Sequence, residues 1–198
     1  MTTEADDKIQ LVDTWPVETP DDEMGVSGHL QWAWSYQFAA RVLLKHQNGR
    51  NQSFYMGPLL QSCGMAAELT LKAMLRGVGK SSKELKKFGH NTYDAYQAAK
   101  GQFHEGRFVK LLIALTQHRQ LPEEIQSRAT GSEIISLDNQ WRAYFPHLDL
   151  LDKTYDRPFR TRYVQGGAVV VPDAEMVLIG NEVLLSAMDA RIMRCSEH

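Results

Sequence analysis

Apolar residues recur at the spacing of an α-helix along most of the chain after residue 26. A first segment follows an N-cap candidate, Ser27, and repeats near the 3.6-residue period of a core-facing stripe at Leu30, Trp34, Phe38, Val42, Leu43 and Leu44. A second segment, over about residues 55–77, has Pro58 in an early turn. It shows so little polar surface that it predicts a central helix.

Four more helical segments follow from the same pattern. Residues 81–87 predict a short exposed turn of helix, and Asn91 can cap a helix that runs to about residue 99. The stretch 105–119 is apolar nearly all round at its centre, which predicts a second central helix. A further helix opens at Ser132 and is expected to end or kink at Pro146, because proline lacks the N–H that a helix interior needs.

The last part of the chain predicts one long connection and one long helix. Between His147 and Gly167 no period is sustained, so we expect a loop. The final helix is expected to have Pro172 at its first position and Arg194 in its last turn. The whole pattern predicts an all-α protein, an up-and-down bundle of five to six helices without internal repeats.

Charge divides the chain into two parts. Residues 1–24 carry eight acidic side chains against the single base Lys8, which gives this segment a net charge of −7. Because the whole chain carries −2, residues 25–198 carry +5. We therefore expect an acidic, extended or disordered arm over residues 1–26 and one helical-bundle domain over residues 27–198.

Composition and motifs exclude several classes of protein. The 43% of hydrophobic and 23% of charged residues are typical of a globular domain. No apolar run approaches the roughly 18 residues of a membrane-spanning helix, so we expect a cytoplasmic chain without membrane contact. Cys63 and Cys195 lie in apolar helical patterns, which indicates two reduced, buried thiols. We expect no cofactor and no metal, because no second ligand cluster accompanies His147, Asp149 and Asp152.

Charged residues on the most apolar helix need an explanation. Glu68 and Lys72 stand four residues apart with the acid first, so that they can pair on one face. On an exposed face such a pair would contribute only about 0.3–0.5 kcal/mol. His90 begins the helix that must return alongside the second one. We expect Glu68, Lys72 and His90 to form a polar cluster at the edge of the core.

The same segment resembles a known family. It reads Met65-Ala66-Ala67-Glu68-Leu69-Thr70-Leu71-Lys72-Ala73-Met74-Leu75, followed after a gap by Gly89-His90 at the start of a helix. This is similar to the HEPN superfamily of helical domains, in which a helix of the form small, Glu, Leu, any, Leu, Lys, any, any, Leu precedes one that starts with Gly or Lys, His, any, Leu. Thr92 stands in place of that last aliphatic residue. Arg160–Tyr163 is similar to the Arg-Tyr-Pro of many members, with Val164 in place of the proline.

The resemblance also implies an activity to test. Catalytic members of the superfamily are metal-independent RNases, in which a His acts on a ribose 2′-OH and an Arg stabilises the phosphorane. The resemblance implies a signature of an Arg, a polar residue directly after it, and a His that follows the Arg after four to six intervening residues. Three pairs have this spacing: Arg41 with His46, Arg142 with His147, and Arg191 with His198. Arg41 and His46 would point about 140° apart on a helix, and His198 stands at a terminus that should fray. Arg142 and His147 are therefore the candidate catalytic pair, although Ala143 stands where active members have a polar residue.

Partners follow from exposed surface and charge. We expect a homodimer, because Trp32, Trp34 and the long helices offer more apolar surface than one small bundle covers. We expect contact with RNA through a set of basic side chains and one aromatic ring: Lys83, Lys86, Lys87, Arg157, Arg160, Arg162 and Tyr163. The leading hypothesis is a HEPN-like binding or dimerisation module without catalysis, in the defence or toxin–antitoxin setting that the resemblance suggests. The alternatives are a metal-independent endoribonuclease and a bundle that holds a small apolar ligand.

Overall fold

The computed structural model describes residues 24–47, 52–102, 104–118, 141–155 and 170–195. Within these ranges every regular element is helical, which confirms the all-α class. The elements are α1 (Val26–His46), α2 (Gln52–Gly77), α3 (Ser82–Lys86), α4 (Thr92–Ala99), the 3-10 helix η2 (Lys100–Gln102), α5 (Glu105–His118), α8 (Tyr144–Tyr155) and α9 (Ala174–Cys195). Each of these helices is too short or too polar to span a bilayer.

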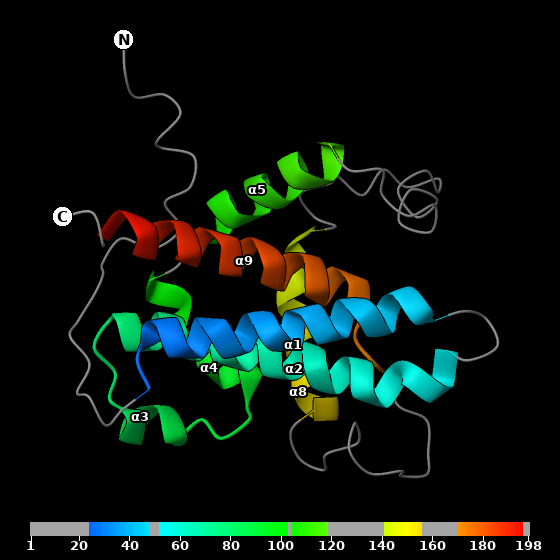
Figure 1. Ribbon diagram of the computed structural model, residues 1–198, viewed down its shortest axis with the longest axis horizontal. Helices are drawn as coiled ribbons and strands as arrows, with labels where there is room; N and C mark the ends of the chain where they lie inside the picture. Colours follow the sequence, from blue (N-terminus) through cyan, green and yellow to red (C-terminus); the bar gives the residue numbers. More distant parts are fainter. Residues whose placement is uncertain (1–23, 48–51, 103, 119–140, 156–169, 196–198) are drawn as a thin grey trace.

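The long helix α2 lies at the centre of the bundle. It runs antiparallel to α1, and α9 lies along both of them (Figure 1). The side chains of α1 reach α9 directly, because Gln37 donates to the Leu178 carbonyl at 2.7 Å and the Trp34 indole N–H donates to Asp189. The helices α4 and α8 pack against α2 and against each other. The predicted central position of the second helix is therefore confirmed.

The turns around α3 and α4 follow local sequence signals. Ser81 caps α3 through a capping box with Glu84, in which each side chain bonds the other residue's backbone N–H. Asn91 caps α4 and accepts from the Asp94 N–H at 2.6 Å, as predicted. Gly79 and Gly89 have φ values of 91° and 56°, a region that glycine enters without steric cost. These caps fix the turn that precedes His90.

Two glycines let the aromatic rings of α8 approach its neighbours closely. A Cβ atom on Gly64 of α2 would lie 2.4 Å from the Tyr155 ring, and one on Gly180 of α9 would lie 2.2 Å from the Tyr144 ring. Real Cβ atoms do not come so near, so only glycine fits at either position. The first residue of α8 thus packs directly against α9, and the last packs directly against α2.

The existence of α8 corrects the sequence analysis. Pro146 does not end a helix, since it is the third residue of α8, where its missing N–H has no intrahelical partner to lose. The predicted loop after His147 is helical as far as Tyr155. Charged residues interrupt the apolar stripe of α8 in the sequence, so that its helical period was not recognised. The stripe consists of Tyr144, Phe145, Leu148, Leu151 and Tyr155. The helix predicted to open at Ser132 lies outside the described residues up to residue 140.

The predicted position of α5 is wrong. Phe108, Val109 and Leu112 are buried, but Arg107 and Lys110 are exposed. A helix with one buried stripe packs at the edge of a bundle, and α5 lies along the outer side of α9 (Figure 1). It is therefore a peripheral helix, whereas α2 alone has the predicted central role.

Two predicted helix starts are each shifted by two residues. The first helix begins at Val26 with Gly25 as its N-cap, so that Ser27 lies inside it. The last helix begins at Ala174 and not at Pro172. Asp173 caps it, because its Oδ1 accepts from the backbone N–H groups of the second and third helical residues at 3.0 and 3.2 Å.

Candidate functional site

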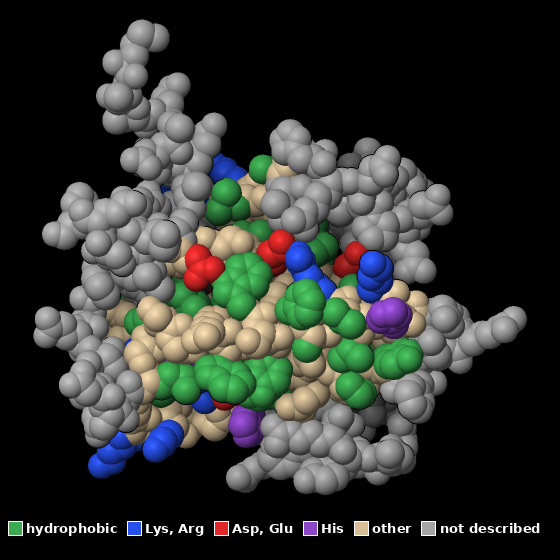
Figure 2. Space-filling model, in the orientation of Figure 1, with side chains coloured by type: hydrophobic (Ala, Val, Ile, Leu, Met, Phe, Trp, Pro, Cys, Tyr) green, Lys and Arg blue, Asp and Glu red, His purple; other side chains and the backbone are tan. Residues whose placement is uncertain are grey.

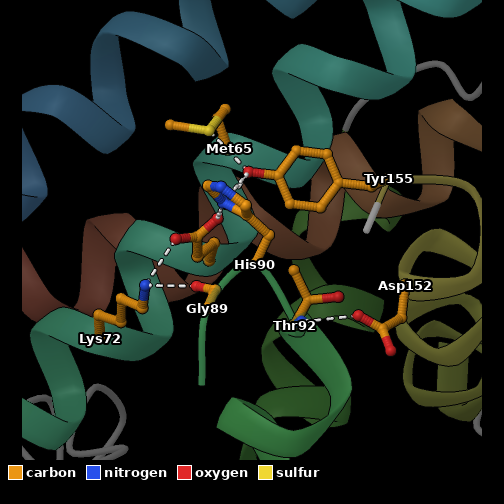
Figure 3. Close-up of polar contacts among 8 residues, drawn as sticks. Met65, Lys72, Gly89, His90, Thr92, Asp152 and Tyr155 are labelled. Atoms are coloured by element: carbon orange, nitrogen blue, oxygen red, sulfur yellow. Dashed lines mark hydrogen bonds and ion pairs between the residues drawn. The ribbon is translucent and has the colours of Figure 1, made fainter. Parts of the chain in front are cut away.

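The structure brings Glu68, Lys72 and His90 together around one carboxylate. The Glu68 side chain is only 5% exposed, and its Oε1 accepts from Lys72 Nζ at 2.6 Å. Its Oε2 accepts from His90 Nδ1 at 3.0 Å and from the Tyr155 hydroxyl at 2.6 Å. Figure 3 shows the side chains of Lys72, His90 and Tyr155 converging from α2, from the turn before α4 and from the end of α8. We call Glu68, Lys72, His90 and Tyr155 the Glu68 cluster.

The turn before α4 is held by Lys72. Its ammonium group donates to the Gly89 carbonyl at 2.7 Å as well as to Glu68. Since Gly89 has a positive φ, this bond fixes a turn that places His90 over the carboxylate (Figure 3). The His90 ring also meets the Tyr155 ring edge-on, with centroids 5.7 Å apart. The Lys72 side chain therefore positions His90 as well as neutralising Glu68.

Tyr155 is the member of the cluster that the sequence analysis missed. It is fully buried, and its hydroxyl lies 2.6 Å from Met65 Sδ on the side away from Lys72. One turn earlier on α8, Asp152 accepts from the Thr92 N–H at 3.0 Å, and the Thr92 hydroxyl donates to the Leu148 carbonyl at 3.3 Å. The polar contacts thus join α2, α4 and α8 across the edge of the core.

A buried histidine on α1 lies near the same cluster. His29 is 7% exposed, and its Nδ1 donates to the Gly25 carbonyl at 2.9 Å. Burial lowers the pKa of His29, and the positive charges of Lys72 and Arg76 lower it further, against the opposing effect of that hydrogen bond and of Glu68. His29 is therefore held in its neutral form at neutral pH.

The candidate catalytic residues lie at the start of α8. Arg142 precedes the helix and is exposed. His147 lies in the helix, and its Nδ1 accepts from the backbone N–H of Asp173 at 2.9 Å. Because a backbone amide can only donate, this nitrogen carries no proton and the ring helps to cap α9. The His147 ring thus has a structural contact that the spacing of the two residues did not predict.

Only some of the basic residues that were predicted to contact RNA lie in the part of the chain that the structure describes. Lys83, Lys86 and Lys87 are exposed on α3 and at its C-cap. Glu84 lies among them and pairs with Lys80 at 3.0 Å. The bonds from the Ser81 backbone, from Lys80 and from the Ser81 hydroxyl lower the pKa of Glu84 to about 2. The remaining predicted contacts lie outside the described residues: Arg157, Arg160, Arg162 and Tyr163.

The helix α1 exposes an apolar face. Trp32, Phe38 and Val42 are 54%, 70% and 40% exposed, and the Trp32 ring lies beside that of Tyr36. Figure 2 shows hydrophobic side chains gathered over the face that α1 and α2 present. We call Trp32, Phe38, Val42 and the residues between them on that side the α1 face. Trp34 does not belong to it, because its ring packs against the core.

Other sites considered from the sequence are filled or inert. Cys63 is a free thiol, and burial raises its pKa far above the ordinary value, so it is not a nucleophile. The interior space between α2, α4, α8 and α9 has no room for a water molecule, which leaves none there for an apolar ligand. The part of the chain that the structure describes contains no group of three or more side chains suited to bind a metal ion.

Comparison of the chain with protein-family models, with curated proteins and with solved structures finds no match. The structure itself places the protein in the all-α class, with the described helices bundled around α2. Its function has to be inferred from the Glu68 cluster and the α1 face.

Proposed function

We propose that this protein is a HEPN-like helical module that binds another polypeptide through the α1 face and does not cleave RNA. The observation that carries the proposal is the exposure of Trp32 and Phe38 in the middle of a 21-residue helix whose opposite side is buried. Large aromatic side chains are the residues that most often dominate the binding energy of protein interfaces.

The size of the α1 face supports this proposal. Aromatic side chains bury roughly 150–250 Å² each when fully covered. At the exposures seen here, Trp32, Phe38 and Val42 leave on the order of 300 Å² of apolar surface in solvent. Apolar surface of this extent is at the lower end of the scale at which patches on soluble proteins act as binding sites.

The geometry of His147 argues against the RNase alternative. A general base must offer an unprotonated nitrogen to the substrate hydroxyl. In His147 the unprotonated nitrogen is Nδ1, which is already bonded to the Asp173 N–H, and the neutral ring then carries its proton on Nε2. Using Nδ1 as a base would remove a capping contact of α9.

The Glu68 cluster supports a structural role in the same way. Both oxygens of its carboxylate are bonded to side chains of the chain itself, and Tyr155 and Lys72 are mostly buried. Buried polar networks of this kind hold helices in one arrangement. We assign the cluster to the joining of α2, α4 and α8.

Photo-crosslinking tests the binding proposal. A photoreactive phenylalanine analogue in place of Phe38 is expected to crosslink to a polypeptide in cells that produce the protein. The same analogue in place of Gln97, which is exposed on α4, is the matched control. The product at position 38 should disappear when Trp32→Ser is added. Equal crosslinking at both positions, or none at position 38, would refute the proposal.

An RNase assay tests the alternative. Purified protein is expected to leave a fluorescent single-stranded RNA intact, with or without added divalent metal. Metal-independent cleavage that is lost in both Arg142→Ala and His147→Ala would instead establish the endoribonuclease. Contact with RNA through Lys83, Lys86 and Lys87 and a defence or toxin–antitoxin role remain predictions from charge and from the resemblance.

A further inference from the structure

We infer that the partner of the α1 face is an acidic amphipathic helix of a separate protein, whose carboxylates pair with the basic side chains in the C-terminal half of α1. This inference rests on the proposed function, because it names the kind of polypeptide that the α1 face binds. It is carried by the balance of charge on α1 and α2, by the position of Lys45 beside Phe38, and by the order of side chains around α1.

The two helices on this side of the molecule are poor in acidic side chains. α1 and α2, of 21 and 26 residues, contain one acidic residue between them, Glu68, although the chain has 24 in 198 residues. Glu68 is 4% exposed, and both of its carboxylate oxygens accept hydrogen bonds from neighbouring side chains. Arg41 and Lys45 of α1, in contrast, are exposed. An acidic partner therefore meets no like charge from either helix, whereas a basic partner would meet two.

The two bases lie beside the exposed apolar side chains of the α1 face. At about 100° per residue, Lys45 lies about 20° from Phe38 around the helix and Arg41 lies about 60° from it. Arg41 pairs with Glu182 of α9, and its side chain is still 44% exposed. Lys45 has no acidic partner among the described residues. The Lys45 ammonium group is therefore the charge that a carboxylate beside Phe38 would meet.

The order of side chains around α1 suits a helical partner. Trp32 and Phe38, which are 54% and 70% exposed, stand about 120° apart around the helix. The small side chains of Ser35 and Ala39 lie between them, and both are exposed or half-exposed. Two large rings on either side of small side chains leave room for a ridge of side chains from another helix, which is how two helices pack. Apolar residues of the partner at helical spacing would fill this strip, and its flanking carboxylates would reach the bases.

The charge of the rest of the chain acts in the same direction. Residues 25–198 carry a net charge of +5, and a field of this sign raises the rate at which an acidic partner associates at low salt. A second copy of this chain would bring an α1 that has no acidic residue to face Lys45. A separate acidic helix therefore complements the α1 face better than a second copy does.

Two helical peptides that differ only in charge test the inference on the full chain. Both carry leucine at the first and fourth positions of three seven-residue repeats, and glutamate at the outer positions of one peptide is replaced by lysine in the other. The acidic peptide is expected to bind with a micromolar Kd, at least about fivefold more tightly than the basic peptide, in fluorescence anisotropy at about 50 mM salt. Equal affinities, tighter binding of the basic peptide, or no binding of the acidic peptide would overturn the inference.

Three variants test whether the acidic peptide binds at the α1 face. Phe38→Glu should weaken its binding at least about 30-fold, as expected for an aromatic residue that dominates an interface. Lys45→Glu should weaken it about three- to tenfold and strengthen the binding of the basic peptide. Lys110→Glu, at an exposed position of α5, changes the net charge by the same amount and should leave both affinities unchanged. Circular dichroism checks that each variant is folded. An equal loss in Lys110→Glu and Lys45→Glu would show that binding follows net charge alone, and the inference would fail.

The photo-crosslink at position 38 separates this inference from the proposed function. Mass spectrometry of the product is expected to identify a segment of another protein that has more acidic than basic residues, with a yield that falls in Lys45→Glu and not in Lys110→Glu. A neutral or basic segment of another protein, or a second copy of this chain, would overturn the inference and leave the proposed function standing. A crosslink to residues 1–24 of the same chain, or no crosslink at all, would overturn both.

Discussion

Replacing Glu68 by alanine tests the structural role of the Glu68 cluster. The substitution removes the carboxylate acceptor of the fully buried Tyr155 hydroxyl, which keeps only the weak thioether acceptor of Met65, and it removes the counter-charge of Lys72, whose side chain is 12% exposed. A poorly satisfied buried donor costs up to about 1–3 kcal/mol, and breaking a buried ion pair costs about 3–5 kcal/mol. Because Lys72 keeps the Gly89 carbonyl, we expect a loss of about 3 kcal/mol in the free energy of unfolding.

The chain offers a matched control for this measurement. Asp149 and Lys153 form another acid–lysine pair with the same spacing, but their side chains are 38% and 64% exposed. Asp149→Ala should cost no more than about 0.5 kcal/mol. In a chain of this length about 3 kcal/mol corresponds to a fall in Tm of about 6–12 °C.

Thermal and urea unfolding followed by circular dichroism would measure both variants. Tyr155→Phe, alone and combined with Glu68→Ala, adds a double-mutant cycle that isolates the hydroxyl–carboxylate bond. A Glu68→Ala protein that unfolds within 2 °C of Asp149→Ala would refute the reasoning. Additive effects of Glu68→Ala and Tyr155→Phe would show that the two groups do not interact.

Three further outcomes are expected. The free energy of unfolding should fall as the pH drops from about 6.5 through the lowered native pKa of His29, because His29 binds a proton more readily in the unfolded chain. Urea unfolding at pH 7.5, 6 and 5 should show a smaller fall for His29→Gln than for the wild type. Gly64→Ala should lower stability by about 1–3 kcal/mol through its clash with the Tyr155 ring, and a smaller residue at position 155 should recover part of the loss. Deleting residues 1–24 should strengthen RNA binding at about 50 mM salt, as measured by fluorescence anisotropy. Equal affinity with and without this acidic segment would exclude its competition with RNA for the side chains of Lys83, Lys86 and Lys87.

The sequence predicted those helix ends that depend on the backbone preferences of single residues. Asn91 and the glycines after α2 mark helix ends through their own backbone preferences, and the structure agrees at each. Pro146 gives an ambiguous signal, because a proline ends a helix in its interior but is accommodated in the first turn of one, as it is in α8. Position relative to an unknown start decides between these roles, so the sequence alone could not place α8.

The Glu68 cluster shows the same limit at the level of the site. Two charges on an apolar helix and a histidine at the next helix start were sufficient to predict three members. Tyr155 is 87 residues from Glu68, and its part depends on α8 and on the space above Gly64. A contact between distant segments has no local signal. The interpretation of Phe38 and Val42 as part of a core-facing stripe is likewise wrong, since α2 and α9 cover other sides of α1 and leave both side chains exposed.

The contact between α1 and α9 has a consequence for the synthesis of the chain. Gln37 bonds to a carbonyl 141 residues later, and Trp34 bonds to a side chain 155 residues later. While the chain leaves the ribosome, α1 and α2 can pair early, but the side of α1 that α9 covers stays open until α9 has emerged. During that interval α1 presents two apolar sides instead of one. We therefore expect nascent chains that stop before α9 to be the form most exposed to chaperones and to aggregation.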